Sequence, residues 1–283
     1  MFQVKEIEAK SILSPSKIPG LDYSLNPYIG CRFGCIYCYA SFMGKSVGKK
    51  VGDWGEYVFV KTNAPTLLDK EIKKLKNHGS GKEIWLSSVT DPYQGLEAGY
   101  QVTRKCLDVL IKNDYRGLVS ILTKSDLILR DIDLYKKLPK VDLGLTITTT
   151  DDSISRFFEK FAPPVSARLK ALTALNRHNL PTYAFVGPLF PHIIEDDKAL
   201  EKLFSQIHKT GTRDIYVEYF NPSRYIVERL KNELGSEKKN IAFYTQSKRK
   251  DKRRQWDKKV GSLIKKYGFR LRTGGTLYHP EMN

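Results

Sequence analysis

The stretch Asn26-Pro27-Tyr28-Ile29-Gly30-Cys31-Arg32-Phe33-Gly34-Cys35-Ile36-Tyr37-Cys38-Tyr39 contains three of the four cysteines of this 283-residue chain. Thiols spaced so closely indicate a metal site. A tetrahedral zinc site needs four ligands, and the nearest histidine in the sequence is His78. Three thiolates can instead hold three irons of a [4Fe-4S] cluster and leave the fourth iron open for chemistry. A zinc knuckle and a chance crowding of core cysteines are the alternatives.

The order and spacing of these cysteines resemble the CxxxCxxC signature of the radical S-adenosylmethionine (SAM) superfamily. That signature has an aromatic residue directly before its last cysteine, and here this residue is Tyr37. Gly30 and Gly34 stand where a tight loop around a cluster needs unusual backbone angles. The wider stretch resembles the spore photoproduct lyase-like branch, in which a tyrosine follows the last cysteine of the motif, as Tyr39 does here. The resemblance covers about residues 20–235 and is strongest over 26–40 and 90–94.

This resemblance implies a [4Fe-4S] cluster bound by Cys31, Cys35 and Cys38. It also implies that SAM bound to the cluster is cleaved to methionine and a 5′-deoxyadenosyl radical after reduction by an electron donor such as ferredoxin or flavodoxin. In lyases of this branch, the tyrosines on either side of the third cysteine take part in returning the hydrogen atom, which makes Tyr37 and Tyr39 the implied catalytic residues. Those lyases also use a cysteine near the end of the second strand as hydrogen donor. Here residues 87–90 read Ser-Ser-Val-Thr, which argues against lyase activity of the same kind.

Length and composition are those of a soluble globular enzyme, with 41% hydrophobic and 11% aromatic residues. No apolar run approaches the roughly 18 residues of a membrane span, and the first residues lack a signal-peptide core. We therefore expect a cytoplasmic protein that does not interact with membranes. Cys106 lies in step with Val102, Val109 and Leu110 on one helical face, so it is expected to be a small core residue.

Short apolar strands alternate with amphipathic helices along most of the chain. Strands are predicted at 23–30, 83–89, 118–123, 143–149, 183–186 and 215–219. Helices are predicted at 65–78, 102–113, 132–138, 166–179, 197–210 and 223–233. This alternation favours an α/β fold with a parallel sheet, and six units are fewer than the eight of a closed barrel. Because radical SAM enzymes are similar in using six units, we predict an open (β/α)6 partial TIM barrel.

The predicted domains are an N-terminal lead-in over 1–22, the partial barrel over 23–240 and a basic helical extension over 241–283 that packs on the barrel. From Lys248 to Arg272 there are twelve Lys or Arg residues against Asp251 and Asp257, a net charge of +10 out of +17 for the whole chain. Such a field favours a polyanionic partner. We expect this segment to bind nucleic acid, with DNA favoured over RNA. The alternative is the highly charged surface of a heat-adapted protein.

Catalytic groups of parallel α/β barrels gather at the carboxyl ends of the strands. Polar side chains follow nearly every predicted strand. By resemblance, the loop after the second strand receives the SAM amine, Lys124 pairs with its carboxylate, and Tyr37 lies near its adenine. The predicted cofactor-binding set is Tyr37, Ser88, Thr90, Asp91, Lys124, Ser125, Thr148, Glu218 and Asn221.

Three functions follow from these observations. The preferred hypothesis is a radical SAM enzyme that acts on nucleic acid, with DNA repair favoured over RNA modification. The second keeps the radical chemistry and moves it to a peptide or a small metabolite. The third is a non-catalytic iron-sulfur protein that binds nucleic acid. Salt-dependent nucleic-acid binding separates the first from the second, and SAM cleavage separates both from the third.

Overall fold

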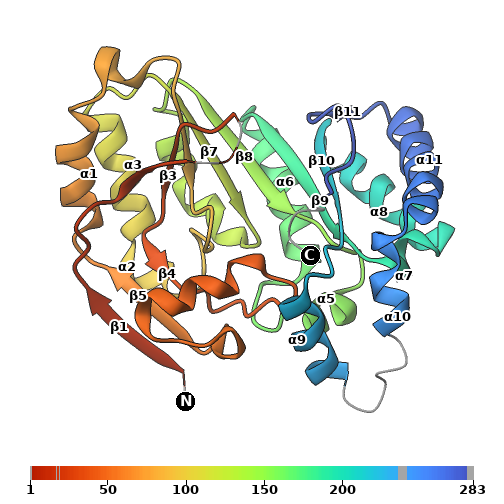
Figure 1. The fold of residues 1–283 in the computed structure, drawn as a ribbon. Helices are drawn as coiled ribbons and strands as arrows, with labels where there is room; N and C mark the ends of the chain where they lie inside the picture. Colours follow the sequence, from red (N-terminus) through yellow and green to blue (C-terminus); the bar gives the residue numbers. More distant parts are fainter. Residues whose placement is uncertain (1, 17, 19, 235–240, 279–283) are drawn as a thin grey trace.

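A computed structural model describes residues 2–16, 18, 20–234 and 241–278 of the chain (Figure 1). Its main sheet has eight strands in the order β11-β10-β9-β8-β7-β6-β3-β2. All neighbouring strands are parallel except β2 and β3, which are antiparallel. The bounds are β2 (Leu13–Pro15), β3 (Tyr23–Leu25), β6 (Glu83–Leu86), β7 (Leu118–Thr123), β8 (Val141–Thr146), β9 (Thr182–Leu189), β10 (Asp214–Tyr219) and β11 (Arg270–Leu271).

The sheet is open, because β11 and β2 form its two edges. The six parallel strands from β3 to β10 confirm the predicted six-unit partial barrel. The helices are α1 (Ala64–Ile72), α2 (Glu97–Tyr100), α3 (Val102–Lys112), α4 (Ile132–Tyr135), α5 (Asp152–Phe158), α6 (Val165–Arg177), α7 (Pro191–Ile194), α8 (Asp197–Lys209), α9 (Arg224–Leu234), α10 (Ile241–Tyr244) and α11 (Lys250–Tyr267). The 3₁₀ segments among the described residues are η1 (Tyr39–Val47), η2 (Val51–Asp53), η3 (Lys76–Gly79), η4 (Asp126–Asp131) and η6 (Thr245–Lys248).

Helix α8 illustrates how the sequence produces the outer layer. The Asp196 carboxylate accepts hydrogen bonds from the first backbone N–H groups of the helix and so satisfies donors that have no partner within it. The buried residues Leu200, Leu203, Phe204 and Ile207 follow at helical spacing, which gives the helix one apolar face for the sheet. Cys106 is fully buried in α3, as predicted.

The predicted strand 23–30 is wrong, because the chain divides at Asn26-Pro27 between two sheets. β3 joins the main sheet beside β6, whereas β4 (Tyr28–Ile29) pairs with β5 (Tyr57–Lys61) in a small sheet that β1 (Gln3–Ile7) completes. Proline cannot donate a hydrogen bond to a ladder, so a break at Pro27 costs no backbone pairing. Strand β5 was not predicted, although four of its five residues are buried.

Two further strands end earlier than predicted. β6 stops at Leu86 because Ser87 has a φ of 66°, a left-handed angle that a strand cannot contain. β8 begins at Val141 and stops at Thr146, which leaves Thr148 in the loop beyond the strand. These early ends place more side chains at the carboxyl edge of the sheet than the sequence indicated.

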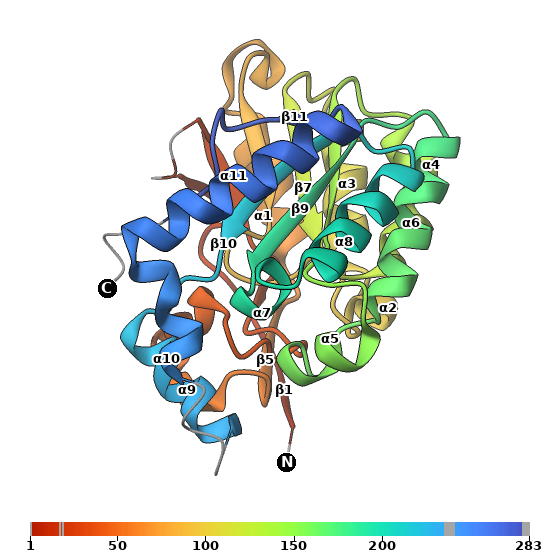
Figure 2. The same cartoon turned by 90° about the vertical axis from the view of Figure 1, so that its right-hand side faces the viewer.

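The predicted domain boundary at 240 lies outside the described residues, and the division into domains stays a prediction. In the described part, α11 packs against α8. Its Trp256 is fully buried and donates a hydrogen bond from Nε1 to Glu195 (3.0 Å). Figure 2 shows α11 lying along the outer side of the sheet near β10. None of the described helices is long and apolar enough to cross a membrane.

Candidate active site

The cysteine loop crosses the carboxyl edge of the open barrel, between β4 and η1 (Figure 1). Gly30 and Gly34 have φ angles of 86° and 61°, as the motif predicted. A Cβ atom on Gly30 would lie 2.5 Å from the Tyr57 carbonyl oxygen, so only glycine fits there. Cys31 and Cys35 are buried, and Cys38 is partly buried.

The segment 90–94 braces this loop. The Thr90 hydroxyl donates to the Gly30 carbonyl (2.6 Å), and the Gln94 Oε1 atom accepts from the backbone N–H of Arg32 (2.9 Å). Both side chains therefore hold the backbone on either side of Cys31. The family resemblance predicted that Thr90 binds SAM. In the structure the Thr90 hydroxyl instead donates its hydrogen bond to the Gly30 carbonyl.

Asp91 links the loop after β6 to the end of β7. Its carboxylate accepts hydrogen bonds from the Thr123 hydroxyl (2.6 Å) and from the backbone N–H groups of Tyr93 and Lys124 (both 2.9 Å). Burial raises the pKa of Asp91 even though these donors oppose that shift. The carboxylate thus orients Lys124 through its backbone.

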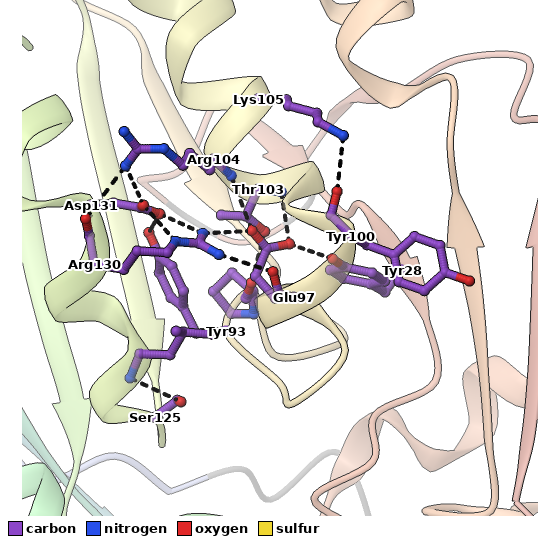
Figure 3. Close-up of polar contacts among 12 residues, drawn as sticks. Tyr28, Tyr93, Glu97, Tyr100, Thr103, Arg104, Lys105, Ser125, Arg130 and Asp131 are labelled. Carbon is purple, nitrogen blue, oxygen red and sulfur yellow. Dashed lines mark hydrogen bonds and ion pairs between the residues drawn. The ribbon is translucent and has the colours of Figure 1, made fainter.

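A buried polar network holds the segment 90–94 in place (Figure 3). Glu97 is fully buried and accepts from the Tyr28 hydroxyl in β4, from the Arg130 guanidinium (2.7 Å), and from the first N–H groups of α3. Arg130 also pairs with Asp131, which accepts from the Tyr93 hydroxyl (2.9 Å). The network ties the strand that enters the cysteine loop to the segment that braces it.

A second buried network supports Tyr37 and was not predicted. Its hydroxyl donates to Glu159, which pairs with Arg168 (2.5 Å), and both charged side chains are fully buried. The Thr148 hydroxyl donates to the same carboxylate at 3.5 Å. Thr148 therefore contributes to this network. Glu159 and Arg168 could not be found from the sequence, because no motif marks them and only the fold brings them to Tyr37.

Three cations surround the thiols. Lys124 lies near Cys35, with its Nζ 5.6 Å from the centre of the Tyr37 ring. Arg168 is also near Cys35, and Arg229 of α9 is near both Cys35 and Cys38. Burial lowers the pKa of Arg229, and one of its terminal nitrogens has no hydrogen-bond partner among the described residues. This positive field suits a site that holds several anionic sulfurs.

The residues present fit a cluster. Burial raises the pKa of Cys35 to about 12 and also raises that of Cys31, so iron would have to displace protons from both thiols. Within the described ranges, no three Cys, His, Asp or Glu side chains converge where a single metal ion could bind. In a [4Fe-4S] cluster each cysteine thiolate binds a different iron, so the three thiols do not have to converge on one metal ion.

Several polar atoms at this edge are suited to a bound cofactor. The Ser87 hydroxyl and the Asn221 Oδ1 are buried without a hydrogen-bond partner among the described residues, and Lys124 Nζ donates to no acceptor among them. Buried polar atoms rarely stay unpaired. Asn221 and Lys124 are predicted site residues, whereas Ser87 was missed.

The remaining predicted residues have other contacts. The Ser125 hydroxyl caps η4 by accepting from the N–H of Leu127, and Ser88 accepts a hydrogen bond from Asn26 (3.4 Å). Glu218 lies near the hydroxyl of Tyr39. That hydroxyl donates to the Ser88 carbonyl. The predicted set is thus gathered at one edge, and at least six of its nine side chains make hydrogen bonds within the described part of the protein: Tyr37, Ser88, Thr90, Asp91, Ser125 and Thr148.

His192 of α7 lies in an aromatic cluster beside this edge and was also missed. Its ring stacks on Phe158 and Phe190, with centroids at 5.8 and 5.5 Å, and Phe190 contacts Tyr37 edge-on. Both ring nitrogens are buried without a hydrogen-bond partner among the described residues. Burial lowers the pKa of His192 to about 4.

We expect this histidine to make the fold sensitive to acid. Between pH 6.5 and about 4 the unfolded chain binds a proton that the folded chain excludes, so stability falls as the pH falls. The loss is about 2–3 kcal/mol. Urea unfolding at pH 7.5 and pH 5 should show a smaller difference for His192→Phe than for the wild type. Equal differences would contradict a buried neutral imidazole.

Comparison with known proteins assigns the chain to a class. The family model of the Radical SAM superfamily matches residues 25–204. This chain belongs to the radical SAM superfamily, whose members use a [4Fe-4S] cluster and SAM in radical catalysis. The predicted resemblance is therefore confirmed at the level of the superfamily.

Individual relatives cover most of the chain. Uncharacterized protein MJ0683 of Methanocaldococcus jannaschii is 39% identical over 221 residues, which are 78% of this chain and 78% of that protein. Uncharacterized protein Rv2578c of Mycobacterium tuberculosis is 28% identical over 75% of this chain. The alignment spans 63% of the mycobacterial protein, so this chain matches less than two thirds of its length.

The fold is similar to that of spore photoproduct lyase. The structure of that lyase complexed with dinucleoside spore photoproduct has a TM-score of 0.68 and 15% identity, and the match covers 93% of this chain and 78% of that one. A mutant of the lyase with bound AdoMet and the same dinucleoside has a TM-score of 0.67 and 15% identity. At this identity the similarity shows a shared fold.

Proposed function

We propose that this protein is a radical SAM enzyme that acts on nucleic acid. The observation that carries the radical chemistry is the cysteine loop itself. Its three thiols lie at the carboxyl edge of an open parallel barrel, among Lys124, Arg168 and Arg229. Superfamily membership supports the same chemistry. A cytoplasmic location stays a prediction.

In this proposal Cys31, Cys35 and Cys38 would hold the cluster, and a bound cluster would supply the one-electron chemistry that cleaves SAM. The Lys124 ammonium is placed to bind the methionine carboxylate. Burial alone would lower the pKa of Lys124, but the nearby Cys35 and Glu159 raise it, so the ammonium stays charged. The Ser87 hydroxyl can donate or accept a hydrogen bond, and the Asn221 Oδ1 atom can accept one. Both are therefore suited to contacts with the amine and the ribose of SAM.

The two tyrosines beside Cys38 differ in what they can do. Tyr37 is held by Glu159 in a closed network, which suits orientation of the loop. Tyr39 is 42% exposed, and its backbone carbonyl accepts a hydrogen bond from the Tyr225 hydroxyl (3.2 Å). Tyr39 is therefore the better candidate for returning a hydrogen atom in a chain that has no cysteine at residues 87–90.

The test of this function is anaerobic reconstitution with iron and sulfide, followed by reduction with dithionite. Electron paramagnetic resonance should show a reduced [4Fe-4S] signal that changes when SAM is added, and 5′-deoxyadenosine should form. A protein that binds no cluster, or a cluster that does not respond to SAM, would overturn the proposal. A cluster without SAM cleavage would favour the non-catalytic iron-sulfur protein.

Only part of the basic charge in the C-terminal segment supports nucleic acid as the substrate. Of the twelve basic residues from Lys248 to Arg272, half are held in ion pairs. These are Arg249 with Asp251, Lys252 with Glu195, Lys259 with Asp197, Lys266 with Glu201, Arg270 with Asp214, and Arg272 with Asp142 and Asp214. Five of these six attach the C-terminal segment to acidic residues of the barrel. Their charges are largely neutralised and add little to a long-range field.

The remaining charge is organised along α11. The basic stripe consists of Lys250, Arg254, Lys258 and Lys265, which are all exposed and have no carboxylate at ion-pair distance among the described residues. At 100° per residue, these positions fall within about 80° of the helix circumference. They lie opposite the buried face formed by Trp256, Val260 and Leu263. The stripe is about 22 Å long, which is long enough to follow several phosphates of one strand.

Replacing all four stripe residues with glutamine is expected to weaken DNA binding by roughly a hundredfold to a thousandfold at 0.15 M salt. The slope of log K against log salt should flatten by about three to four, because each phosphate contact contributes about 0.9. Fluorescence anisotropy with a labelled oligonucleotide over a salt series measures both quantities. SAM cleavage without substrate should be unchanged.

A matched control removes four charges from the opposite end of the molecule. Lys70, Lys74, Lys76 and Lys105 of the α1 and α3 region are exposed and also lack ion-pair partners among the described residues. Their replacement changes the net charge by the same amount and should leave the slope nearly intact. Equal slopes in the two variants would contradict the basic stripe. Unchanged binding in both would favour a peptide or small-molecule substrate.

A further inference from the structure

A cleft of about 510 Å³ lies between α9 and η6. Its volume is within the roughly 300–1,000 Å³ of sites that bind small ligands. The lining consists of Pro222, Arg224, Val227, Glu228 and Lys231 together with Thr245 and Lys248. Positions 224, 227, 228 and 231 are three or four residues apart, so they share one face of α9. This face of the helix is therefore open to a ligand.

The cations of this cleft have no acidic partners. Arg224, Lys231 and Lys248 are exposed, and none of them has a carboxylate at ion-pair distance among the described residues. Glu228 is the acidic residue of the lining, and it too forms no ion pair in this part of the chain. Three positive charges against one negative leave a net charge of +2. The cleft therefore favours an anionic ligand.

The η6 turn adds two unpaired polar atoms to this region. Gln246 Oε1 and Ser247 Oγ are buried without a hydrogen-bond partner among the described residues. Both residues lie in the chain between Thr245 and Lys248, which line the cleft. Buried polar atoms rarely stay unpaired. A serine hydroxyl beside unpaired cations is a combination that binds phosphate groups.

The cleft lies between the basic stripe and the candidate active site along the chain. Pro222 directly follows Asn221, a candidate site residue beyond the end of β10. Lys248 stands two residues before Lys250, where α11 and the basic stripe begin. Figure 2 shows α9 and α10 beside the end of α11 at which that helix begins. A strand held by the basic stripe would therefore meet the cleft before it reached the site.

An aromatic surface adjoins α9 on its other side. Tyr39 and Phe42 are each 42% exposed. Both belong to η1, and residues three apart in a 3₁₀ helix lie on the same side of it. The Tyr225 hydroxyl of α9 donates to the Tyr39 carbonyl (3.2 Å), so η1 meets α9 one residue away from Arg224. Exposed aromatic rings beside a cationic groove are typical of sites for unpaired nucleic acid, in which bases stack on the rings and phosphates follow the cations.

We propose that Tyr39, Phe42, Arg224, Lys231 and Lys248 form a single-strand surface, which binds phosphates in the cleft and stacks bases on the two aromatic rings. This inference rests on the proposed function, because it specifies the form of nucleic acid that reaches the site. It assigns single-stranded nucleic acid as the substrate in preference to an intact duplex. The bases of a duplex are stacked on one another and offer no free face to an aromatic ring.

The aromatic part is tested with the reconstituted protein by fluorescence anisotropy, using a labelled single-stranded DNA oligonucleotide and the duplex of the same sequence. Phe42→Ala is expected to weaken single-strand binding about fivefold to a hundredfold, the range for one lost base stack. Its salt slope and its duplex binding should hardly change, because no charge is removed. Phe157→Ala is the matched control, since Phe157 of α5 is also exposed (38%), and it should change neither quantity.

The cationic part is tested by the triple variant Arg224→Gln/Lys231→Gln/Lys248→Gln. Its affinity for the single strand should fall about tenfold to a hundredfold at 0.15 M salt. The salt slope should flatten by about two, because each phosphate contact on a single strand contributes about 0.7. Glu228→Gln should have the opposite effect and tighten binding about twofold to fivefold. Glu8→Gln removes another exposed glutamate that has no ion pair among the described residues, and it should change little.

Several results would overturn the single-strand surface. One is a wild type that binds the duplex at least as tightly as the single strand, a result that leaves the proposed function intact. Equal losses in Phe42→Ala and Phe157→Ala, or an unchanged slope in the triple variant, would do the same. So would a triple variant that loses inorganic phosphate but keeps the oligonucleotide, since the cleft would then serve a free phosphate ligand. A wild type that binds neither form of DNA would contradict the proposed substrate as well.

Discussion

Replacing Cys35 with alanine is expected to abolish SAM cleavage and to remove the brown colour and the paramagnetic signal of the reconstituted protein. A cluster that leaves one iron open has only three protein ligands, so none is dispensable. Cys35 lies between the other two thiols in the motif, and Lys124 and Arg168 both lie near it. The measurement is iron content, electron paramagnetic resonance and 5′-deoxyadenosine yield after reconstitution.

Cys106 supplies the matched control. It is also a buried free cysteine, but it lies in the core face of α3. Cys106→Ala should retain iron, signal and SAM cleavage, and should cost about 1 kcal/mol of stability from the lost packing. Loss of the cluster in Cys106→Ala, or normal SAM cleavage in Cys35→Ala, would contradict the assignment of the ligands.

Replacing Arg168 with methionine is expected to lower the free energy of unfolding by about 3–5 kcal/mol. Arg168 and Glu159 are both fully buried at 2.5 Å, so removing the guanidinium leaves an uncompensated carboxylate in the interior. Arg168 also donates to the carbonyls of Pro163 (2.8 Å) and Thr146 (3.2 Å), and both would lose a donor. Urea unfolding of the apoprotein measures the loss without interference from the cluster.

The double variant Arg168→Met/Glu159→Gln distinguishes charge from packing. It should be more stable than Arg168→Met alone, because no buried charge remains unpaired. If it is no more stable than the single variant, packing and lost donors explain the effect instead. The double variant keeps a hydrogen-bond acceptor for the Tyr37 hydroxyl, which donates to Glu159 in the wild type.

The pH dependence of this pair has a defined sign. Burial alone would raise the pKa of Glu159, but Arg168 and Lys124 lower it in the wild type. The stability that Glu159 contributes is therefore present above its unfolded pKa of about 4.3 and is lost as the pH falls. In Arg168→Met the main opposing cation is gone and burial dominates. The difference in stability between wild type and variant should therefore shrink as the pH is lowered towards 5.

Local sequence was sufficient to predict the superfamily and the class of fold. The cysteine spacing and the two glycines of the loop belong to one contiguous motif, and the regular alternation of apolar strands and amphipathic helices predicted the open six-unit barrel. Helix α8 shows why this works, since its cap and its apolar face are both encoded within a dozen neighbouring residues. The strand 23–30 shows where it fails, because the small sheet that receives Tyr28 is completed by β1 and β5, far away in sequence.

The sequence by itself determined the cysteine motif, the parallel strands and the excess of positive charge, because each is a property of residue type and short-range spacing. Only the tertiary structure decided which charges act together. It paired half of the basic C-terminal residues with acidic residues, and it placed Glu159 and Arg168 behind Tyr37 and Arg229 beside the thiols. The physical reason is that electrostatic and hydrogen-bond energies depend on distance and burial, and the folding of the barrel sets both for residues far apart in the chain.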